Sequence, residues 1–325
     1  MTGAPAPIDW RGGLPIGERG AVITVGTFDG MHRGHHDVLT RLAQLGLATN
    51  RPSVVVTFEP HPLEVVRPAD APPLLTLHDE KLELFAQTGV SYVAVLPFTP
   101  TLASYEAEQF VDAVLVERFG VAELLVGHDH GFGKGRLGDI EVLRVLGAAR
   151  GFGVTVLPPV HAPGGQAISS TSIRSALQRG DLATAATGLG RPYSLSGTVI
   201  HGDQRGRLIG YPTLNLPSPP ARKLLPPDGV YAVRVQTPQG PFGGMLNLGP
   251  RPTFADGSRR VETHLFDVTD DWYGAPIRID LLARIRDTVA FSGVGALRAQ
   301  LARDEAIARE MLRGLTTAEG AAPLS

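Results

Sequence analysis

The hydrophobic pattern of the chain changes near residue 190, and no other feature constrains the fold as strongly. In residues 1–188, short β-branched runs alternate with amphipathic stretches of helical length. In residues 189–325, short apolar runs follow one another with only glycine- and proline-rich turns between them. Such a change indicates separate domains, and 325 residues exceed the usual length of one. The sequence therefore predicts two domains, residues 1–188 and residues 189–325.

The first half predicts a doubly wound, Rossmann-like α/β domain with a parallel sheet. Its candidate strands are nearly continuous apolar runs, as expected of strands covered on both faces. Leu39, Leu42 and Leu47 show the spacing of the helices that alternate with them. The predicted strands are Ala21–Val25, Ser53–Phe58, Tyr92–Leu96, Glu123–Val126 and Val154–Leu157. The predicted helices are residues 35–48, 78–88, 105–118 and 138–150.

The second half predicts an antiparallel β-barrel or sandwich, because crowded short strands without intervening helices pair through tight turns. Its candidate strands are Leu195–Ile200, Val230–Gln236, Gly244–Leu248, Val261–Asp267 and Ile277–Arg286. Ser172–Gly188, before this half, predicts one or two short helices. An amphipathic pattern at residues 293–314 predicts a C-terminal helix.

Composition excludes several classes of protein. The chain has no cysteine, which excludes disulfide scaffolds, zinc ribbons and thiol nucleophiles. Hydrophobic residues make up 43% and the net charge is −2, which excludes a disordered chain and argues against a broadly basic nucleic-acid-binding protein. The sequence shows no secretory leader and no apolar run long enough to span a membrane. We therefore expect a cytoplasmic protein whose partners are neither nucleic acids nor membranes; the pattern indicates no particular oligomeric state.

The turn from the first predicted strand into the first helix carries an unusual string, G-T-F-D-G-M-H-R-G-H-H, at residues 26–36. Ligands of open α/β sheets bind at the carboxyl ends of the strands, where a helix N-terminus offers backbone N–H groups to a phosphate. His32 and His35 are spaced to face the same side of the first helical turn. Imidazoles there can donate hydrogen bonds to a phosphate whose charge grows in the transition state. The string therefore predicts a site for phosphate chemistry.

This string resembles the nucleotidyltransferase superfamily with an H-x-G-H signature, and more closely the N-terminal domain of the prokaryotic bifunctional riboflavin kinase/FAD synthetase family. Three further segments resemble that family in the same order: F-E-P-H-P at 58–62, G-H-D-H-G-F-G at 127–133 and I-S-S-T-S-I-R at 168–174. The resemblance implies that His32, His35 and Arg174 act in catalysis. The implied ATP- or phosphate-binding residues are Gly26, Phe28, Asp29, Gly30, Gly34, Ser170 and Thr171, and the implied flavin-binding residues are Phe58, His61, Asp129 and Phe132. His130 departs from the family, in which an aromatic residue is usual there.

In the second half, Pro212 fixes the backbone so that Thr213 and Asn215 emerge on the same side of an extended segment. A hydroxyl and an amide oxygen are hard donors suited to Mg²⁺ that bridges the phosphates of ATP. A polar-faced edge strand with an ordinary turn accounts for this fragment equally well.

Downstream segments add a resemblance to riboflavin kinases, over residues 206–215, 226–232, 247–254 and 261–265. The resemblance implies that Glu262 is the general base that accepts the proton of the ribityl hydroxyl. It also implies Thr213 and Asn215 as metal ligands. The implied ATP-binding residues of this half are Gly206, Arg207 and Gly210. Leu214 departs from the family, which usually has alanine there.

The resemblance implies a bifunctional enzyme of FAD biosynthesis. The C-terminal domain would phosphorylate riboflavin to FMN with ATP, and the N-terminal domain would adenylylate FMN to FAD with release of pyrophosphate. Mg²⁺ would accompany ATP, while FMN and FAD would be intermediate and product. The alternatives are an adenylyltransferase for another phosphorylated substrate with a β-domain that only binds flavin, a class I aminoacyl-tRNA synthetase, and a non-enzymatic flavin or nucleotide sensor. Retention of Thr213, Asn215 and Glu262 favours the bifunctional enzyme.

Overall fold

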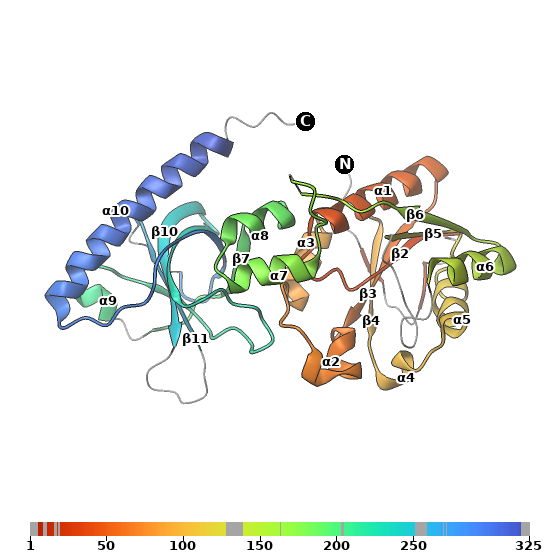
Figure 1. Cartoon of the computed structure of the whole chain (residues 1–325), viewed down its shortest axis with the longest axis horizontal. Coiled ribbons are helices and arrows are strands. Elements are labelled where there is room, and N and C mark those ends of the chain that lie inside the picture. The colour runs from red at the N-terminus through yellow and green to blue at the C-terminus, as the bar shows by residue number, and fades with distance from the viewer. Residues whose placement is uncertain are drawn as a thin grey trace. The chain divides into compact units, whose positions relative to one another are not determined.

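The computed structural model describes residues 6–8, 12–15, 18, 20–127, 139–162, 164–202, 205–250, 259–268, 270 and 272–319. The chain forms two compact units, Met1–Ser170 and Thr171–Ser325 (Figure 1). Within the described ranges, no helix is both long enough and apolar enough to cross a membrane. The domain boundary after residue 188 stays a prediction. Of the two helices before it, α7 (Ser170–Gln178) begins at the last residue of the first unit, and α8 (Leu182–Leu189) contacts strands of the second.

The first unit contains a parallel sheet in the order β1-β4-β3-β2-β5-β6. Its strands are β1 (Ala6–Ile8), β2 (Val22–Val25), β3 (Ser53–Glu59), β4 (Tyr92–Pro97), β5 (Glu123–Gly127) and β6 (Gly153–Leu157). The five predicted strands are confirmed. The additional strand β1 is three residues long and contains a proline, so its sequence carries no strand pattern; at the edge of the sheet a proline is tolerated.

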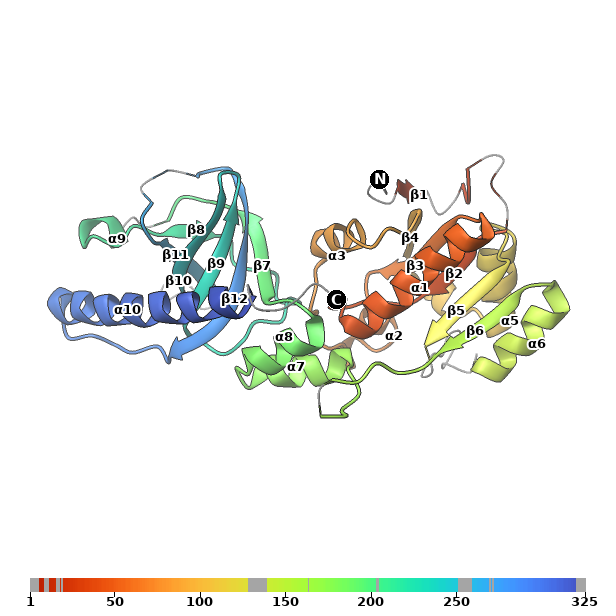
Figure 2. The same ribbon diagram turned by 90° about the horizontal axis from the view of Figure 1, so that it is seen from above.

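Helices cover both faces of this sheet. They are α1 (Arg33–Thr49), α2 (Pro62–Val66), η1 (Pro68–Asp70), α3 (His78–Phe85), α4 (Pro100–Ala103), α5 (Ala107–Phe110), the π-helix η2 (Val111–Val116) and α6 (Ile140–Arg150). Three predicted helices are confirmed, and the fourth, residues 105–118, consists of α5 followed directly by η2. Figure 2 shows α1 over one face of the sheet, with α5 and α6 on the other.

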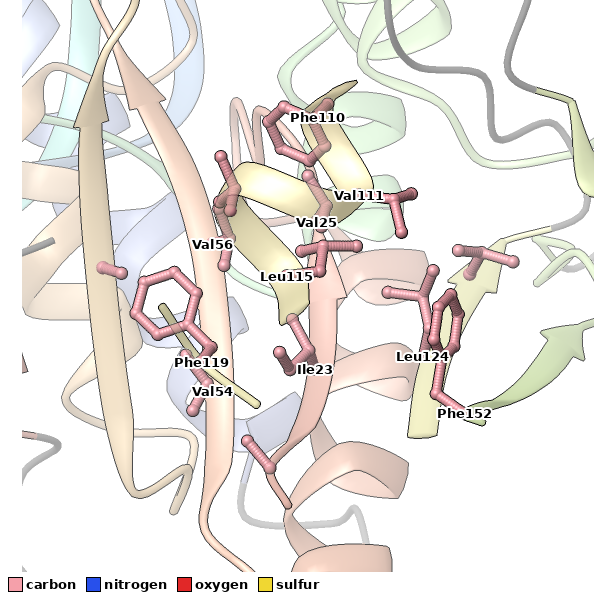
Figure 3. Packing of buried hydrophobic residues seen from close by; sticks show 14 of the residues in the cluster. Ile23, Val25, Val54, Val56, Phe110, Val111, Leu115, Phe119, Leu124 and Phe152 are labelled. Carbon is pink, nitrogen blue, oxygen red and sulfur yellow. The ribbon is translucent and has the colours of Figure 1, made fainter. Parts of the chain in front are cut away.

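Alternate residues of each central strand point into two different cores. Ile23 of β2 packs with Phe110 and Leu115 from α5 and η2, as Figure 3 shows. Its neighbour Val22 packs on the opposite face with Leu39 of α1. Because both faces are buried, most positions of these strands are apolar, with small buried polar residues such as Thr24 and Thr57 among them, and the apolar pattern is nearly continuous.

The order of the strands places a topological switch point between β2 and β5. From β2 the chain proceeds through β3 to β4 on one side, and it then returns to add β5 and β6 on the other. In open parallel sheets, ligands bind outside the carboxyl ends of the strands at such a reversal. The loop that leaves β2 is therefore the expected site.

The second unit is an antiparallel sheet in the order β7-β12-β9-β10-β11-β8, curled into a half-barrel. Its strands are β7 (Tyr193–Thr198), β8 (Leu214–Leu216), β9 (Gly229–Thr237), β10 (Gly240–Pro250), β11 (Arg259–Leu265) and β12 (Pro276–Arg286), and a short helix α9 (Arg205–Leu208) precedes β8. Ile200, just after β7, donates its N–H to the carbonyl of Asn215 on β8 over 2.8 Å, so the two edges of the sheet meet. The five predicted strands are confirmed, with β8 in addition.

The C-terminal helix α10 (Val294–Glu319) lies along this half-barrel (Figure 1). Ala308 is fully buried against an apolar cluster from β9 and β10. The carboxylate of Asp304, also fully buried, accepts hydrogen bonds from Arg286 Nε and Nη2 of β12 at 2.7–3.0 Å. Gln300 Nε2 adds a further bond of 2.8 Å to the same carboxylate. Apolar burial and one buried ion pair therefore attach α10 to the sheet.

We predict that Asp304→Asn lowers the free energy of unfolding by about 3 kcal/mol, because it leaves a largely buried guanidinium without its counter-charge. Urea unfolding followed by circular dichroism measures the change. Asp267→Asn is the matched control. Its carboxylate also binds an arginine of α10, Arg309, over 2.7 and 2.8 Å, but it is 77% exposed, so we expect little change. Equal losses in the two variants would contradict the prediction.

Two candidate active sites

The loop between β2 and α1 has an uncommon backbone conformation. Phe28, Gly30 and Met31 all have positive φ angles, 50°, 82° and 41°. At Gly30 a Cβ atom would lie 2.6 Å from Leu75 Cδ1, so only glycine fits. Residues with side chains adopt positive φ only where their surroundings impose it. The loop is therefore shaped by its contacts before any ligand binds.

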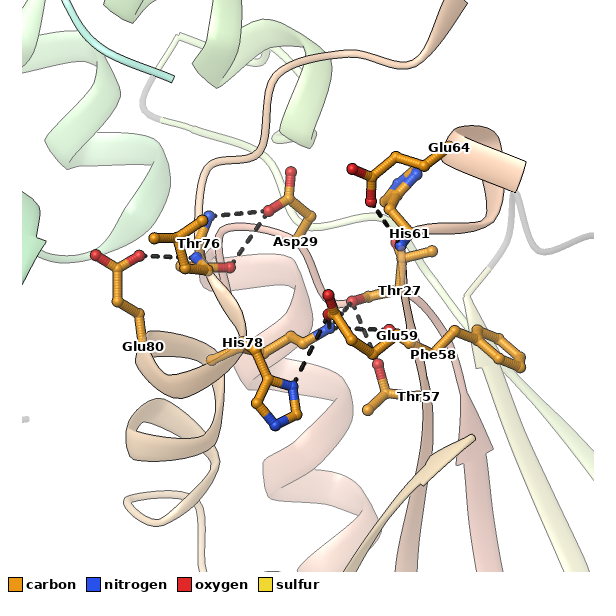
Figure 4. Close-up of polar contacts among 12 residues, drawn as sticks. Thr27, Asp29, Thr57, Phe58, Glu59, His61, Glu64, Thr76, His78 and Glu80 are labelled. Atoms are coloured by element: carbon orange, nitrogen blue, oxygen red, sulfur yellow. Dashed lines mark hydrogen bonds and ion pairs between the residues drawn. The ribbon is translucent and has the colours of Figure 1, made fainter. Parts of the chain in front are cut away.

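Asp29 provides the strongest of these contacts (Figure 4). Its buried carboxylate accepts hydrogen bonds from the backbone N–H groups of Leu75 and Thr76 at 3.0–3.1 Å and from the Thr76 hydroxyl at 3.3 Å. The Thr76 hydroxyl in turn accepts the N–H of Gly30 over 3.0 Å. Direct contact between Asp29 and ATP stays a prediction. The observed role of its carboxylate is to attach the loop to residues 75–76.

His32 is the N-cap residue of α1. Its Nδ1 accepts the backbone N–H of His35 over 3.3 Å. A neutral imidazole that accepts at Nδ1 carries its proton on Nε2, so the cap also determines which nitrogen donates. The rings of His32 and His35 are stacked with centroids 3.6 Å apart, which confirms that the two histidines share one side of the helix start. Gly34 leaves room for this stack, since a Cβ there would lie 3.1 Å from the His32 ring.

Phe28 supports this pair of histidines from the core. Only 3% of it is exposed, and its ring packs edge-on against both His35 and Phe85. Gly26 lies close against the same ring. ATP contacts by Gly26 and Phe28 stay predictions, while the observed role of Phe28 is packing.

The F-x-P-H-P segment follows β3, the strand next to β2. His61 caps α2 as His32 caps α1: its Nδ1 accepts the N–H of Leu63 over 3.2 Å, and its own N–H bonds to Glu64 (Figure 4). Phe58 is buried in the core against Phe98 and Phe110. Flavin binding by Phe58 and His61 stays a prediction. The observed contacts make Phe58 a core residue and fix the proton of a neutral His61 on Nε2.

For the remaining predicted residues of this site, the structure shows few contacts. Ser170 donates its hydroxyl to the carbonyl of Asp29 over 2.9 Å, so Ser170 lies at the H-x-G-H loop. Thr171 is exposed at the start of α7, and Arg174 is half-buried on that helix in the second unit. Asp129, His130 and Phe132 lie outside the described residues. The roles of all these residues stay predictions.

In the second unit, strand register brings together residues that are far apart in the sequence. Glu262 of β11 lies directly opposite Asn215 of β8 on one side and Asn247 of β10 on the other. Residues directly opposite in an antiparallel sheet project from the same face. One row across three strands therefore carries the predicted base Glu262, the predicted metal ligand Asn215 and Asn247. Asn247 was not among the predicted site residues, although it begins the family-like segment 247–254.

The loop before β8 positions Thr213. Gly206 accepts the N–H of Tyr211 over 2.9 Å, and a Cβ at Gly206 would lie 2.2 Å from the Tyr211 carbonyl oxygen. Gly210 has a φ of 85°, and Arg207 is exposed at the tip. ATP binding by Gly206, Arg207 and Gly210 stays a prediction, and the two glycines allow the loop to close tightly on itself.

Charged and aromatic groups surround this row. Arg260 Nη1 pairs with Glu262 Oε1 at 3.0 Å, and both side chains are about a quarter exposed. His264 Nδ1 lies 2.7 Å from the carbonyl oxygen of Pro212, which connects β11 to the Thr213 loop. Tyr231 donates its hydroxyl to the Pro227 carbonyl, and burial raises the pKa of this phenol, so it stays protonated and keeps the 226–229 turn in place.

A doubly wound unit with an H-x-G-H loop at its switch point, followed by a half-barrel with a Glu–Asn row, defines a nucleotidyltransferase joined to a small kinase domain. Comparison with known families agrees. Residues 15–172 match the family model described as FAD synthetase, and residues 189–312 match the model described as riboflavin kinase. Two relatives described as bifunctional riboflavin kinase/FMN adenylyltransferase align over most of the chain. The Escherichia coli (strain K12) protein is 43% identical, covering 92% of this chain and 95% of its own, and that of Pseudomonas fluorescens is 38% identical, covering 90% and 93%.

The chain belongs to the bifunctional riboflavin kinase/FMN adenylyltransferase family. Its activities are those of riboflavin kinase and FMN adenylyltransferase, the two steps of FAD synthesis. A crystal structure from Streptococcus pneumoniae, described as a macrolide-efflux protein, has the same fold. Its TM-score is 0.82 at 31% identity, and the match covers 94% of this chain and 99% of that one.

We predict that Asp29→Ala lowers the free energy of unfolding by about 2 kcal/mol or more, because buried N–H groups at residues 75–76 lose their acceptor. Asp139→Ala is the matched control. The carboxylate of Asp139 also accepts two backbone N–H groups, each over 3.0 Å, but at an exposed helix start, so about 1 kcal/mol is expected. Urea unfolding of both variants measures the difference, and a smaller loss for Asp29→Ala than for Asp139→Ala would contradict the prediction.

Proposed function

We propose that the H-x-G-H loop of the first unit is the site of FMN adenylylation. The phosphate of FMN attacks the α-phosphorus of ATP and pyrophosphate leaves, so the protein need not supply a nucleophile. The N–H groups at the start of α1 and the imidazoles of His32 and His35 stabilise the charge that grows on the transferred phosphate. The cap at His32 is the observation that carries this proposal, since it makes Nε2 the proton donor of a neutral ring.

Arg174, Ser170 and Thr171 are proposed as further phosphate-binding residues for this reaction. An arginine supplies a permanent charge and a planar pair of donors that match phosphate oxygens. The bond from Ser170 to the Asp29 carbonyl, within the first unit, supports a role for Ser170 at the H-x-G-H loop. Asp129 and Phe132 are proposed, with Phe58 and His61, to contact the flavin.

The Glu–Asn row of the second unit is the proposed site of riboflavin phosphorylation. Glu262 accepts the proton of the primary ribityl hydroxyl as that oxygen attacks the γ-phosphorus of ATP. Arg260 pairs with Oε1 of the same carboxylate, and the remaining lone pairs of an ionised carboxylate can accept the substrate hydroxyl. Gly206, Arg207 and Gly210 are proposed to bind the phosphates of ATP.

Mg²⁺ fits the oxygens of Thr213 and Asn215. The amide of Asn215 lies so close to Gly202 that a Cβ there would be 2.3 Å from Nδ2. Nδ2 donates to the Thr213 carbonyl over 3.3 Å, which directs Oδ1 away from that carbonyl. Mg²⁺ commonly takes one or two protein oxygens and completes its shell with phosphates and water. The ion would neutralise charge on the transferred phosphate.

The two activities should separate by mutation. His32→Asn keeps an N-cap acceptor but removes the Nε2 donor, so we expect FMN adenylylation to fall about 100-fold or more while riboflavin phosphorylation continues. Glu262→Gln removes the base without changing the shape, so riboflavin phosphorylation should fall about 100- to 10,000-fold while FMN adenylylation continues. Chromatography of flavins after incubation with ATP and Mg²⁺ measures both products. If either folded variant loses both activities, the two-site proposal fails.

Thr213→Val tests the metal. The substitution is nearly isosteric but removes the hydroxyl oxygen, so half-maximal riboflavin phosphorylation should require more Mg²⁺ than in the unmodified chain. FMN adenylylation, assayed in the same Mg²⁺ titration, serves as the control and should not change. An unchanged Mg²⁺ requirement for phosphorylation would show that Thr213 is not a metal ligand.

A further inference from the structure

A buried lysine contacts two of the segments that carry predicted adenylyltransferase residues. Lys81 of α3 is one of three lysines in the chain, and only 6% of it is exposed. Its Nζ donates to the carbonyl of Phe58 over 3.2 Å and to that of Thr27 over 3.4 Å. Glu59 Oε2 lies 4.0 Å from the same nitrogen. An ammonium group buried to this extent is costly unless such partners compensate for its lost hydration.

The two carbonyls belong to different motifs. Thr27 lies in the H-x-G-H loop after β2, and Phe58 begins the F-x-P-H-P segment at the end of β3. Each segment contains a histidine that caps a helix through Nδ1, His32 in the first and His61 in the second. Since Lys81 bonds to both, its ammonium links the two segments beyond the pairing of β2 with β3 and the bond of 3.3 Å from the Thr57 hydroxyl to the Thr27 carbonyl. Figure 4 shows Thr27, Phe58 and Glu59 grouped at this point, next to His61.

Residues 75–81, the segment that ends at Lys81, also contact the H-x-G-H loop at Asp29 and Gly30. Leu75 and Thr76 bind the carboxylate of Asp29, and Thr76 binds the N–H of Gly30. Residues 75–81 therefore contact the loop both before and after Phe28. Thr76 and Lys81 follow β3, α2 and η1 along the chain, and neither belongs to the family-like segments of the sequence.

We propose that Lys81 is a positioning residue for FMN adenylylation. Its charge keeps the His32 loop and the His61 segment at the separation that the reaction requires. The inference rests on the proposed role of the H-x-G-H loop and adds a residue that contacts neither ATP nor FMN in that proposal. The consequence expected of a positioning residue is a loss of kcat in a folded protein, because a small displacement of catalytic groups slows the reaction steeply.

Lys81→Met removes the charge and all three donors at similar length. We expect kcat for FMN adenylylation to fall about 10- to 100-fold, the value of hydrogen bonds made by a charged group. Lys81→Arg keeps a charge and donors and should recover most of the loss. Riboflavin phosphorylation by the same full-length variants is the internal control and should not change. Lys223→Met is the matched control, because Lys223 is 4% exposed and lies over the Tyr193 ring in the second unit; it should leave FMN adenylylation unchanged.

Thermal unfolding separates positioning from stability. A kcat that stays low at temperatures where Lys81→Met is fully folded supports the proposal. An unchanged kcat in Lys81→Met overturns the proposal. A loss of kcat that disappears at temperatures where the variant is folded also overturns it, and so does an equal loss of kcat in Lys81→Arg. His32→Asn, assayed alongside, tests the underlying assignment. If that variant keeps full FMN adenylylation, the H-x-G-H loop is not the site and the proposed function fails, whatever Lys81→Met does.

Discussion

The adenylyltransferase half depends on one buried carboxylate that binds backbone N–H groups from another part of the chain. Asp29 fastens a loop with three positive φ angles to residues 75–76, and those contacts keep the backbone in a conformation it would not adopt alone. The loop then places His32 at the helix start, where its cap selects the donor nitrogen. A charged residue of the H-x-G-H loop thus supports the shape of that loop through backbone hydrogen bonds.

The kinase half uses strand pairing for the same purpose. Asn215, Asn247 and Glu262 come from three strands, and hydrogen-bonded register places them in one row. Because side chains alternate between faces, a shift of one residue in any of these strands would move its member to the opposite face. The buried attachment of α10 through Asp304 and the contact of His264 with the Thr213 loop stabilise the sheet that carries this row.

Much of the fold follows from local pattern. The ten predicted strands and the long helices α1, α6 and α10 are confirmed. The spacing of apolar residues in each segment reflects which of its faces are buried, and that spacing differs between a strand and a helix. β1 was not predicted, and β8 was expected only as an extended segment, with an edge strand as the alternative, since three residues are too few for a strand pattern. The predicted single helix at 105–118 includes a π-helix, and the spacing of apolar residues did not distinguish its hydrogen bonding from that of an α-helix. Phe28 and Phe58 pack in the core, which a motif does not reveal because it gives residue identity without side-chain direction, and their contacts with ligands stay predictions.

The sequence by itself determined the two domains, the family, both reactions and the motifs, because hydrophobic period and short strings of chemically distinctive residues are local properties. Only the tertiary structure decided what each motif residue contacts. The pairing of Glu262 with Asn215 and Asn247 depends on register, and the link from Lys81 to Thr27 and Phe58 depends on the packing of α3 beside two strand ends. Such contacts join residues that are distant along the chain, and they form only when burial of the apolar faces brings the elements together.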